Sequence, residues 1–349
     1  MILAKRLKIA SAPKRNYFVA VGHNTSPFVT AYPWTASGGF GTKYANPVSL
    51  PAGDVMAIAA HPSGKAIAIA HANSPFFTVY EFSAGGFGAK YSSPALLPVT
   101  TGTDIAWSPD GSWLAVFDVN GTLRIYPFSL VTGIGAQVSS TAFGGGYGAA
   151  HDSLSFSPNA DYLSLEINAS PFFSIFPFNN SNGALSSALS GPVTPPNGSV
   201  YGIKWAPSQG AIAIANSHAT ATLAGYPFNG SIGTRFTNPS GAPTNTAYSL
   251  AFSPQGTFVV IGSSDTPFLH AYPWNDATGF GTKLSSPSPL PVDAAGHVVF
   301  SKTGDALFYT MAVSPYIVAL AWNNGFGAKY SNPAFLPTGN ANSVTFGTI

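Results

Sequence analysis

The chain has 349 residues, of which 45% are hydrophobic, 13% aromatic and only 7% charged, with 37 Gly, 30 Pro and no Cys. So little charge with so many Phe and Tyr residues excludes a disordered polyelectrolyte, and the Gly and Pro content excludes a coiled coil or a helical bundle. The absence of Cys excludes a disulfide framework, thiolate metal sites and a Cys nucleophile. Turn residues spaced among β-branched and aromatic ones favour an all-β chain.

The N-terminus carries much of the positive charge, although the formal net charge is only +2. Its basic residues, in a stretch without any acid, are Lys5, Arg6, Lys8, Lys14 and Arg15. We expect residues 1–13 to form an arm that contacts a neighbouring subunit, with a frayed terminus as the alternative. The rest of the chain offers no broad basic face for nucleic acid. Because the charges interrupt the apolar start and no long apolar run follows, neither a secretory signal nor a membrane span is expected.

An internal repeat of 48 residues determines the predicted fold. SPF stands at Pro27, Pro75 and Pro171, and the close variants TPF and SPY stand at Pro267 and Pro315, so that successive spacings are 48, 96, 96 and 48 residues. Seven such units account for residues 14–349. A fixed period of this length indicates a propeller or another repeat architecture.

Each repeat contains four predicted strands in the same order. The first ends in a Pro and Gly turn, as in residues 104–111 (DIAWSPDG), and a second strand follows, as in residues 257–262. The third carries an aromatic pair around Pro, as in residues 32–34 (YPW), and the fourth follows a Gly-bracketed Phe, as in residues 39–51. Seven units of four short strands predict an all-β, seven-bladed β-propeller of four-stranded antiparallel blades that forms a single domain over residues 14–349.

The two chain ends complete one blade in this prediction. Residues 341–349 form a first strand with nothing after it, and residues 15–34 form a second and a third strand with nothing before them. Pairing of these segments would close the ring and remove two open sheet edges.

The repeat resembles known propellers. Its turns and length are similar to those of Trp-Asp-repeat propellers, and residues 178–193 resemble a stretch of phosphogluconolactonase-type propellers. The SPF, YPW and GFGTKYSNP tandem pattern resembles repeats in proteins of tailed bacteriophages and prophages. That resemblance implies a virion-associated propeller. Residues 129–245 depart most from the repeat, which favours a partner-specific surface there that includes Tyr147 and His151.

Polar residues recur at the end of each second strand, and they could in principle bind metal. They are His23, His71, Asp118, Glu166 and Asn216. Metal ligands must converge on one ion within ~2.0 to 2.6 Å. Because equivalent positions on successive blades lie farther apart, we expect these side chains to brace the blades or to face solvent.

Three acidic residues lie near the starts of innermost strands, namely Asp54, Asp104 and Asp152, with His151 and His297 as further candidates. Metal-dependent lactonase propellers gather acidic ligands at such positions. The three Asp residues precede the following turn Pro by eight, five and six residues, which predicts different heights along the axis. We therefore favour Asp residues that bond their own backbone over a shared site.

Two more features recur on the outer strands. Single cations follow the Gly-Phe-Gly turn, and we expect them to protect sheet edges rather than to bind anions; they are Lys43, Lys90, Arg235, Lys283 and Lys329. The Phe of the turn is expected to pack beneath its blade rather than to stack on a sugar; the examples are Phe40, Phe87, Phe280 and Phe326.

No phosphate loop, nucleophile elbow or zinc-protease motif is present. Together with the low charge and the basic arm, the resemblance to phage repeats implies a non-enzymatic structural component of a phage particle, located in the virion and without a cofactor. Its partners would be other virion proteins, in several copies, and neither nucleic acid nor a membrane. The alternatives are a lactonase-like hydrolase that uses the axial Asp and His residues, and a glycan-binding propeller.

Overall fold

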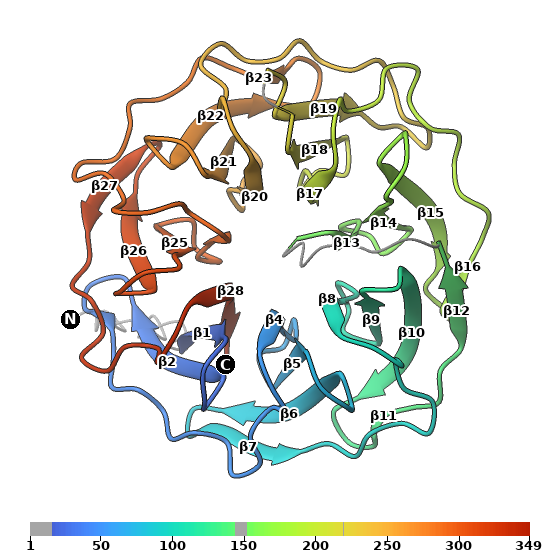
Figure 1. The fold of residues 1–349 in the computed structure, drawn as a ribbon, viewed down its shortest axis with the longest axis vertical. Helices are drawn as coiled ribbons and strands as arrows, with labels where there is room; N and C mark the ends of the chain where they lie inside the picture. The colour runs from blue at the N-terminus through green and yellow to red at the C-terminus, as the bar shows by residue number, and fades with distance from the viewer. Residues whose placement is uncertain (1–15, 144–151, 219) are drawn as a thin grey trace, which may run out of the picture.

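Seven small antiparallel sheets surround a central axis (Figure 1). The computed structural model describes residues 16–143, 152–218 and 220–349. The predicted seven-bladed propeller is confirmed. The predicted contact residues Lys5, Arg6, Lys8, Lys14, Arg15, Tyr147 and His151 lie outside the described residues. Within the described part, no helix has the length and apolarity needed to cross a bilayer.

The blades are numbered here from the N-terminus. Blade 1 holds β1 (Tyr17–His23), β2 (Val29–Thr35), β3 (Gly39–Phe40) and β28 (Ala341–Thr348). Blade 2 holds β4 (Val55–Ala60), β5 (Ala66–His71), β6 (Phe77–Ser83) and β7 (Gly86–Lys90). Blade 3 holds β8 (Gly102–Trp107), β9 (Trp113–Asp118), β10 (Thr122–Ser129), β11 (Gly133–Ile134) and β12 (Ser139–Ala142).

The remaining blades follow the same order. Blade 4 holds β13 (Leu154–Phe156), β14 (Tyr162–Glu166), β15 (Phe173–Asn179) and β16 (Ala184–Leu185). Blade 5 holds β17 (Val200–Trp205), β18 (Ala211–Asn216) and β19 (Leu223–Pro227), with a bridge between Phe228 and Ile232 in place of a fourth strand. Blade 6 holds β20 (Ala247–Phe252), β21 (Phe258–Ser263), β22 (Leu269–Asn275) and β23 (Gly279–Phe280). Blade 7 holds β24 (Val298–Phe300), β25 (Ala306–Thr310), β26 (Ile317–Trp322) and β27 (Phe326–Lys329).

The ring closes through β28, which pairs antiparallel with β1 and forms the inner edge of blade 1 (Figure 1). Cα partners run from Tyr17 with Thr348 to His23 with Ala341, as the closure predicted from the two chain ends requires. The last strand of the chain therefore supplies one of the seven inner strands around the axis, namely β4, β8, β13, β17, β20, β24 and β28.

The core lies between blades rather than inside any one of them. Each hydrophobic cluster joins side chains of two adjacent blades, as where Phe173 and Ile175 of blade 4 meet Ile203 and Ile214 of blade 5. Because successive strand residues point to opposite faces, each blade buries both of its faces against its neighbours. In the part of the chain that the structure describes, each inner strand pairs with one neighbouring strand only, so its other edge faces the channel.

Tyrosines at one repeated position of the third strands, mostly within an aromatic-Pro-aromatic motif, tie neighbouring blades together. Each donates its hydroxyl to a carbonyl of the segment that leads out of the preceding blade, at 2.6 to 3.1 Å. The pairs are Tyr32 with Phe335, Tyr80 with Ser49, Tyr126 with Leu96, Tyr226 with Thr194 and Tyr272 with Gly241. Blade 4 has Phe176 at this position and lacks the hydroxyl.

Candidate functional site

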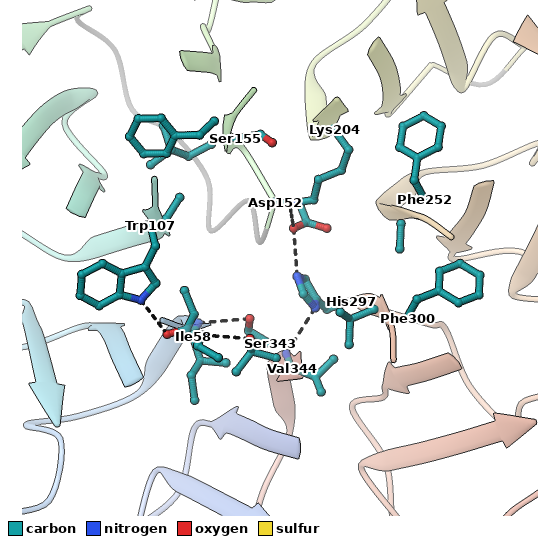
Figure 2. A pocket seen from close by; sticks show the side chains of 18 of the residues that line it. Ile58, Trp107, Asp152, Ser155, Lys204, Phe252, His297, Phe300, Ser343 and Val344 are labelled. Atoms are coloured by element: carbon teal, nitrogen blue, oxygen red, sulfur yellow. Dashed lines mark hydrogen bonds and ion pairs between the residues drawn. The ribbon is translucent and has the colours of Figure 1, made fainter. Parts of the chain in front are cut away.

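A cavity of about 790 Å³ occupies the axial channel, and all seven inner strands contribute to its lining. Its rim is formed by the turns that follow the inner strands, at Pro62, Pro109, Pro207, Pro254 and Lys302. Its walls are mostly apolar and aromatic. One of these wall residues, Trp107, is fixed by a 3.1 Å hydrogen bond from Nε1 to the carbonyl of Ala59 (Figure 2).

Five ionisable side chains line the same cavity. Lys302 lies at its rim, and the other four are called the charged cluster below; they are Asp104, Asp152, Lys204 and His297. They come from four different blades, and the sequence separates them widely. Only the closed ring brings them together.

Asp152 is the centre of the charged cluster, and only 4% of its side chain is exposed. Its Oδ1 lies 2.5 Å from Lys204 Nζ and 3.0 Å from His297 Nε2, and its Oδ2 accepts a hydrogen bond from the Ser249 hydroxyl. Burial by itself would raise the pKa of Asp152, but the interactions with His297 and Lys204 outweigh it and hold that pKa well below the usual range. Asp152 is therefore a carboxylate that joins four blades across the channel.

Lys204 is the most accessible member of the cluster, with 29% of its side chain exposed. Burial would lower the pKa of its ammonium group, but Asp152 and Asp104 reverse the direction and raise it. Lys204 is therefore a permanent cation that reaches the cavity, suited to hold an anionic or strongly polarised oxygen.

His297 is held in one tautomer by its two neighbours (Figure 2). The amide of Val344 donates to Nδ1 at 3.3 Å, so the proton lies on Nε2, which donates to Asp152. The His297 amide in turn donates to Thr310 Oγ1 at 2.9 Å. Ring and backbone of His297 are thus both fixed.

Asp104 has different surroundings from Asp152. Its Oδ1 accepts the Ile105 amide at 2.7 Å, and its Oδ2 accepts the Leu154 amide at 2.8 Å and the Ser153 hydroxyl at 3.3 Å. Burial raises the pKa of Asp104 to about 6; Lys204 and the amide donors oppose this increase, and the charge of Asp152 adds to it. Two carboxyl groups in one cavity with pKa values moved in opposite directions are suited to different roles in a reaction.

The structure corrects the expectation for the three axial Asp residues. Asp104 and Asp152 do converge, whereas Asp54 is exposed and stays apart from the cavity lining. Asp104 and Asp152 lie at unequal sequence distances from the turn Pro of their blades, but this does not keep them apart. The side chain of Asp152 reaches across the channel toward the blades opposite. Of the two candidate His residues, His297 joins the cluster and His151 lies outside the described residues.

The repeated polar residues at the ends of the second strands brace the blades, as predicted. All are buried, and several bond nearby atoms: His71 Nδ1 lies 2.8 Å from the Asn73 carbonyl, and Asp118 pairs with Arg124 at 2.5 Å. Burial, followed by the charge of Asp104, raises the pKa of another member, Glu166, to about 8. Among the described residues, no group of three or more His, Asp or Glu side chains could hold a metal ion.

The Phe residues of the outer-strand turns pack within their blades, as expected, and the cation Arg235 makes hydrogen bonds there. Phe40, Phe87, Phe280 and Phe326 pack against the aromatic residues of their own blades, with ring centroids 4.9 to 5.3 Å from Trp34, Phe82, Trp274 and Trp322. Arg235 bonds the Leu223 carbonyl at 2.9 Å and Asn238 at 3.0 Å, within its own blade.

Lys204 and Ser249 escaped the sequence analysis. A signal for Lys204 does exist, because its position in the inner strand is otherwise small or uncharged: Ala59, Ala106, Ser155, Ala251, Val299 and Thr345. A lone Lys that breaks such a pattern marks a functional candidate. Ser249 carried no comparable signal.

Comparison with known proteins supports the propeller. The family described as WD domain, G-beta repeat matches residues 99–126, just over half of one 48-residue unit. No curated protein matches the sequence. A putative 6-phosphogluconolactonase from Bacteroides fragilis has a TM-score of 0.73 at 12% identity, covering 97% of this chain and 99% of that one. One from Bacteroides uniformis has the same score and identity, covering 95% and 100%.

A third similar structure is the periplasmic gluconolactonase of Pseudomonas aeruginosa, with a TM-score of 0.69 at 14% identity, covering 95% of this chain and 99% of that one. At such identities the likeness concerns the fold. The expectation of a non-enzymatic virion component is wrong: the three similar structures carry the names of lactonases, and none of these names concerns a virion. The expected virion partners and location stay untested predictions.

Proposed function

We propose that the chain hydrolyses a lactone in its axial cavity. The observation that carries the proposal is the charged cluster itself: a carboxyl group with a pKa of about 6, Asp104, shares a cavity with a permanent cation, Lys204. Ester hydrolysis needs a base for water and a positive group for the carbonyl oxygen, and this pair supplies both. The names of the similar propellers support a sugar lactone as the substrate class.

The reaction assigns one role to each residue. Ionised Asp104 takes a proton from water, whose oxygen bonds to the lactone carbonyl carbon. Lys204 stabilises the negative charge that develops on the carbonyl oxygen. When the bond from the carbonyl carbon to the ring oxygen breaks, Asp104 returns the proton to the leaving oxygen, and a hydroxy acid results. Asp152 stays ionised and holds Lys204.

Hydrolysis of glucono-1,5-lactone and of its 6-phosphate, measured as acid release above the spontaneous rate, tests the proposal. We expect turnover by the wild-type chain and a loss of about 10²- to 10⁴-fold for Asp104→Asn, as is usual for a general base. Asp54→Asn is the control, because Asp54 is an exposed Asp just before another inner strand and lies outside the cavity lining, and it should keep full activity. A folded wild-type protein that adds nothing to the spontaneous rate would contradict the proposal.

The likeness of the repeats to those of phage and prophage proteins concerns the origin of the chain. It stays a prediction, and the genes that flank the coding sequence would test it.

A further inference from the structure

Lys204 has a long, flexible side chain, and something must hold its ammonium group if it is to act on one oxygen atom. Packing of the inner strands does not hold the ammonium group in place, because Lys204 is the most accessible member of the charged cluster. Its ammonium group forms a 2.5 Å ion pair with Asp152 Oδ1. The position of Lys204 Nζ therefore depends on how Asp152 is held.

His297 approaches the same oxygen of Asp152 from blade 7, at 3.0 Å, while Ser249 of blade 6 occupies the other oxygen. His297 cannot turn away, because the Val344 amide holds its Nδ1 and Thr310 holds its backbone amide. Figure 2 shows Val344, His297, Asp152 and Lys204 as a continuous chain of contacts from the C-terminal strand to the cavity.

We propose that His297 is a positioning residue for lactone hydrolysis, which acts on Lys204 through Asp152. By donating a hydrogen bond to Oδ1, the imidazole fixes the orientation of the carboxylate and so fixes the ammonium group that faces the carbonyl oxygen. The inference rests on the proposed function for its catalytic consequence. The geometric part, that His297 orders Lys204, can be tested by itself.

Two substitutions separate this role from simple packing. His297→Gln keeps a side-chain N–H donor at a similar reach, and His297→Leu removes it. We expect His297→Leu to lower kcat by about 10- to 10²-fold with little change in KM, because oxyanion stabilisation acts in the transition state. His297→Gln should recover most of that loss. Equal losses in both variants would overturn the inference.

The Lys204→Met background gives the sharper test. If His297 acts only through Lys204, His297→Leu should cause no further fall in kcat once Lys204 is absent. A second fall by the same factor would show an independent role and would overturn the inference. His71→Leu is the control for loss of a buried His, since His71 lies in blade 2 away from the cavity lining; it should lower stability without changing kcat.

A measurement without turnover keeps the two proposals distinguishable. In protein labelled with 15N-lysine, the ammonium group of Lys204 should give a protected NMR signal in the wild-type chain and in His297→Gln, assigned by its absence from Lys204→Met. The signal should disappear in His297→Leu. If it persists there, the positioning inference is wrong whatever the chain hydrolyses. If the signal behaves as expected and no lactone is hydrolysed, only the proposed function fails.

Discussion

The hydroxyl of Tyr32 in blade 1 donates a 2.6 Å hydrogen bond to the carbonyl of Phe335, which follows blade 7. This contact lies at the boundary between blade 7 and blade 1, the blade that holds the closing strand β28. It belongs to the series of five equivalent bonds between neighbouring blades. Burial moves the pKa of Tyr32 well above its usual range, so the hydroxyl keeps its proton and remains a donor.

Tyr32→Phe should therefore lower the free energy of unfolding by about 1 to 2 kcal/mol, from the lost bond and the unpaired carbonyl. Urea denaturation measures the effect. Tyr17→Phe is the matched control, since its hydroxyl makes no hydrogen bond within the described part of the chain and its removal should change little. Equal effects of the two substitutions would contradict the assigned role. Phe176, at the equivalent position of blade 4, shows that the fold tolerates the loss.

Acid should destabilise the fold through its buried His residues. Burial lowers the pKa values of His23, His71 and His270 to about 4, whereas the unfolded chain binds these protons near pH 6.5. Stability should thus be complete above about pH 6.5 and fall as the pH decreases toward 4, by up to about 3 kcal/mol for each residue. Urea denaturation repeated across this range measures the slope.

His71→Asn should reduce that slope, because it removes one of the buried imidazoles that bind a proton on unfolding. The fold should accept Asn, since Asn216 occupies the same position in blade 5. The reciprocal change, Asn216→His, should increase it. Slopes identical to wild type in both variants would refute the assignment.

The pH dependence of lactone hydrolysis should report Asp104. With a pKa of about 6, the residue acts as a base only when ionised, so kcat/KM should rise with pH up to about 6 and then level. Lys204 lowers the pKa of Asp104. Lys204→Met should therefore move the rise to higher pH as well as reduce the rate. An unchanged midpoint in that variant would mean that another group controls the rise.

Asp152→Asn should be strongly destabilising at neutral pH. It leaves the Lys204 ammonium group without its counter-ion, a change that costs about 3 to 5 kcal/mol for fully buried pairs and less here, because Lys204 is partly exposed. Since the folded-state pKa of Asp152 is depressed, its contribution is present above about pH 4 and is lost as the pH falls further.

Chemical denaturation at pH 7 would measure this. Lys204→Met added to Asp152→Asn should restore part of the stability, whereas Asp54→Asn should have no effect. A loss of stability in Asp152→Asn that Lys204→Met leaves unchanged would argue against an electrostatic origin.

The amino-acid sequence by itself determined the propeller. The 48-residue period, the Pro and Gly turns and the unmatched strands at the two ends specify seven blades and their closure, because strand formation and turn geometry depend on local sequence. At Gly111 and Gly256, for example, the predicted turns require the positive φ that is observed, 78° and 70°.

Tertiary structure alone decided the site. Asp152 meets His297 from 145 residues away, and the contact exists only because seven inner strands converge on one axis. A periodic reading compares equivalent positions, whereas Asp104, Asp152, Lys204 and His297 break the repeat at different positions and meet through side chains of different reach. The closed ring determines which of these non-repeating residues face each other across the channel. No local sequence pattern encodes the distances between their side chains.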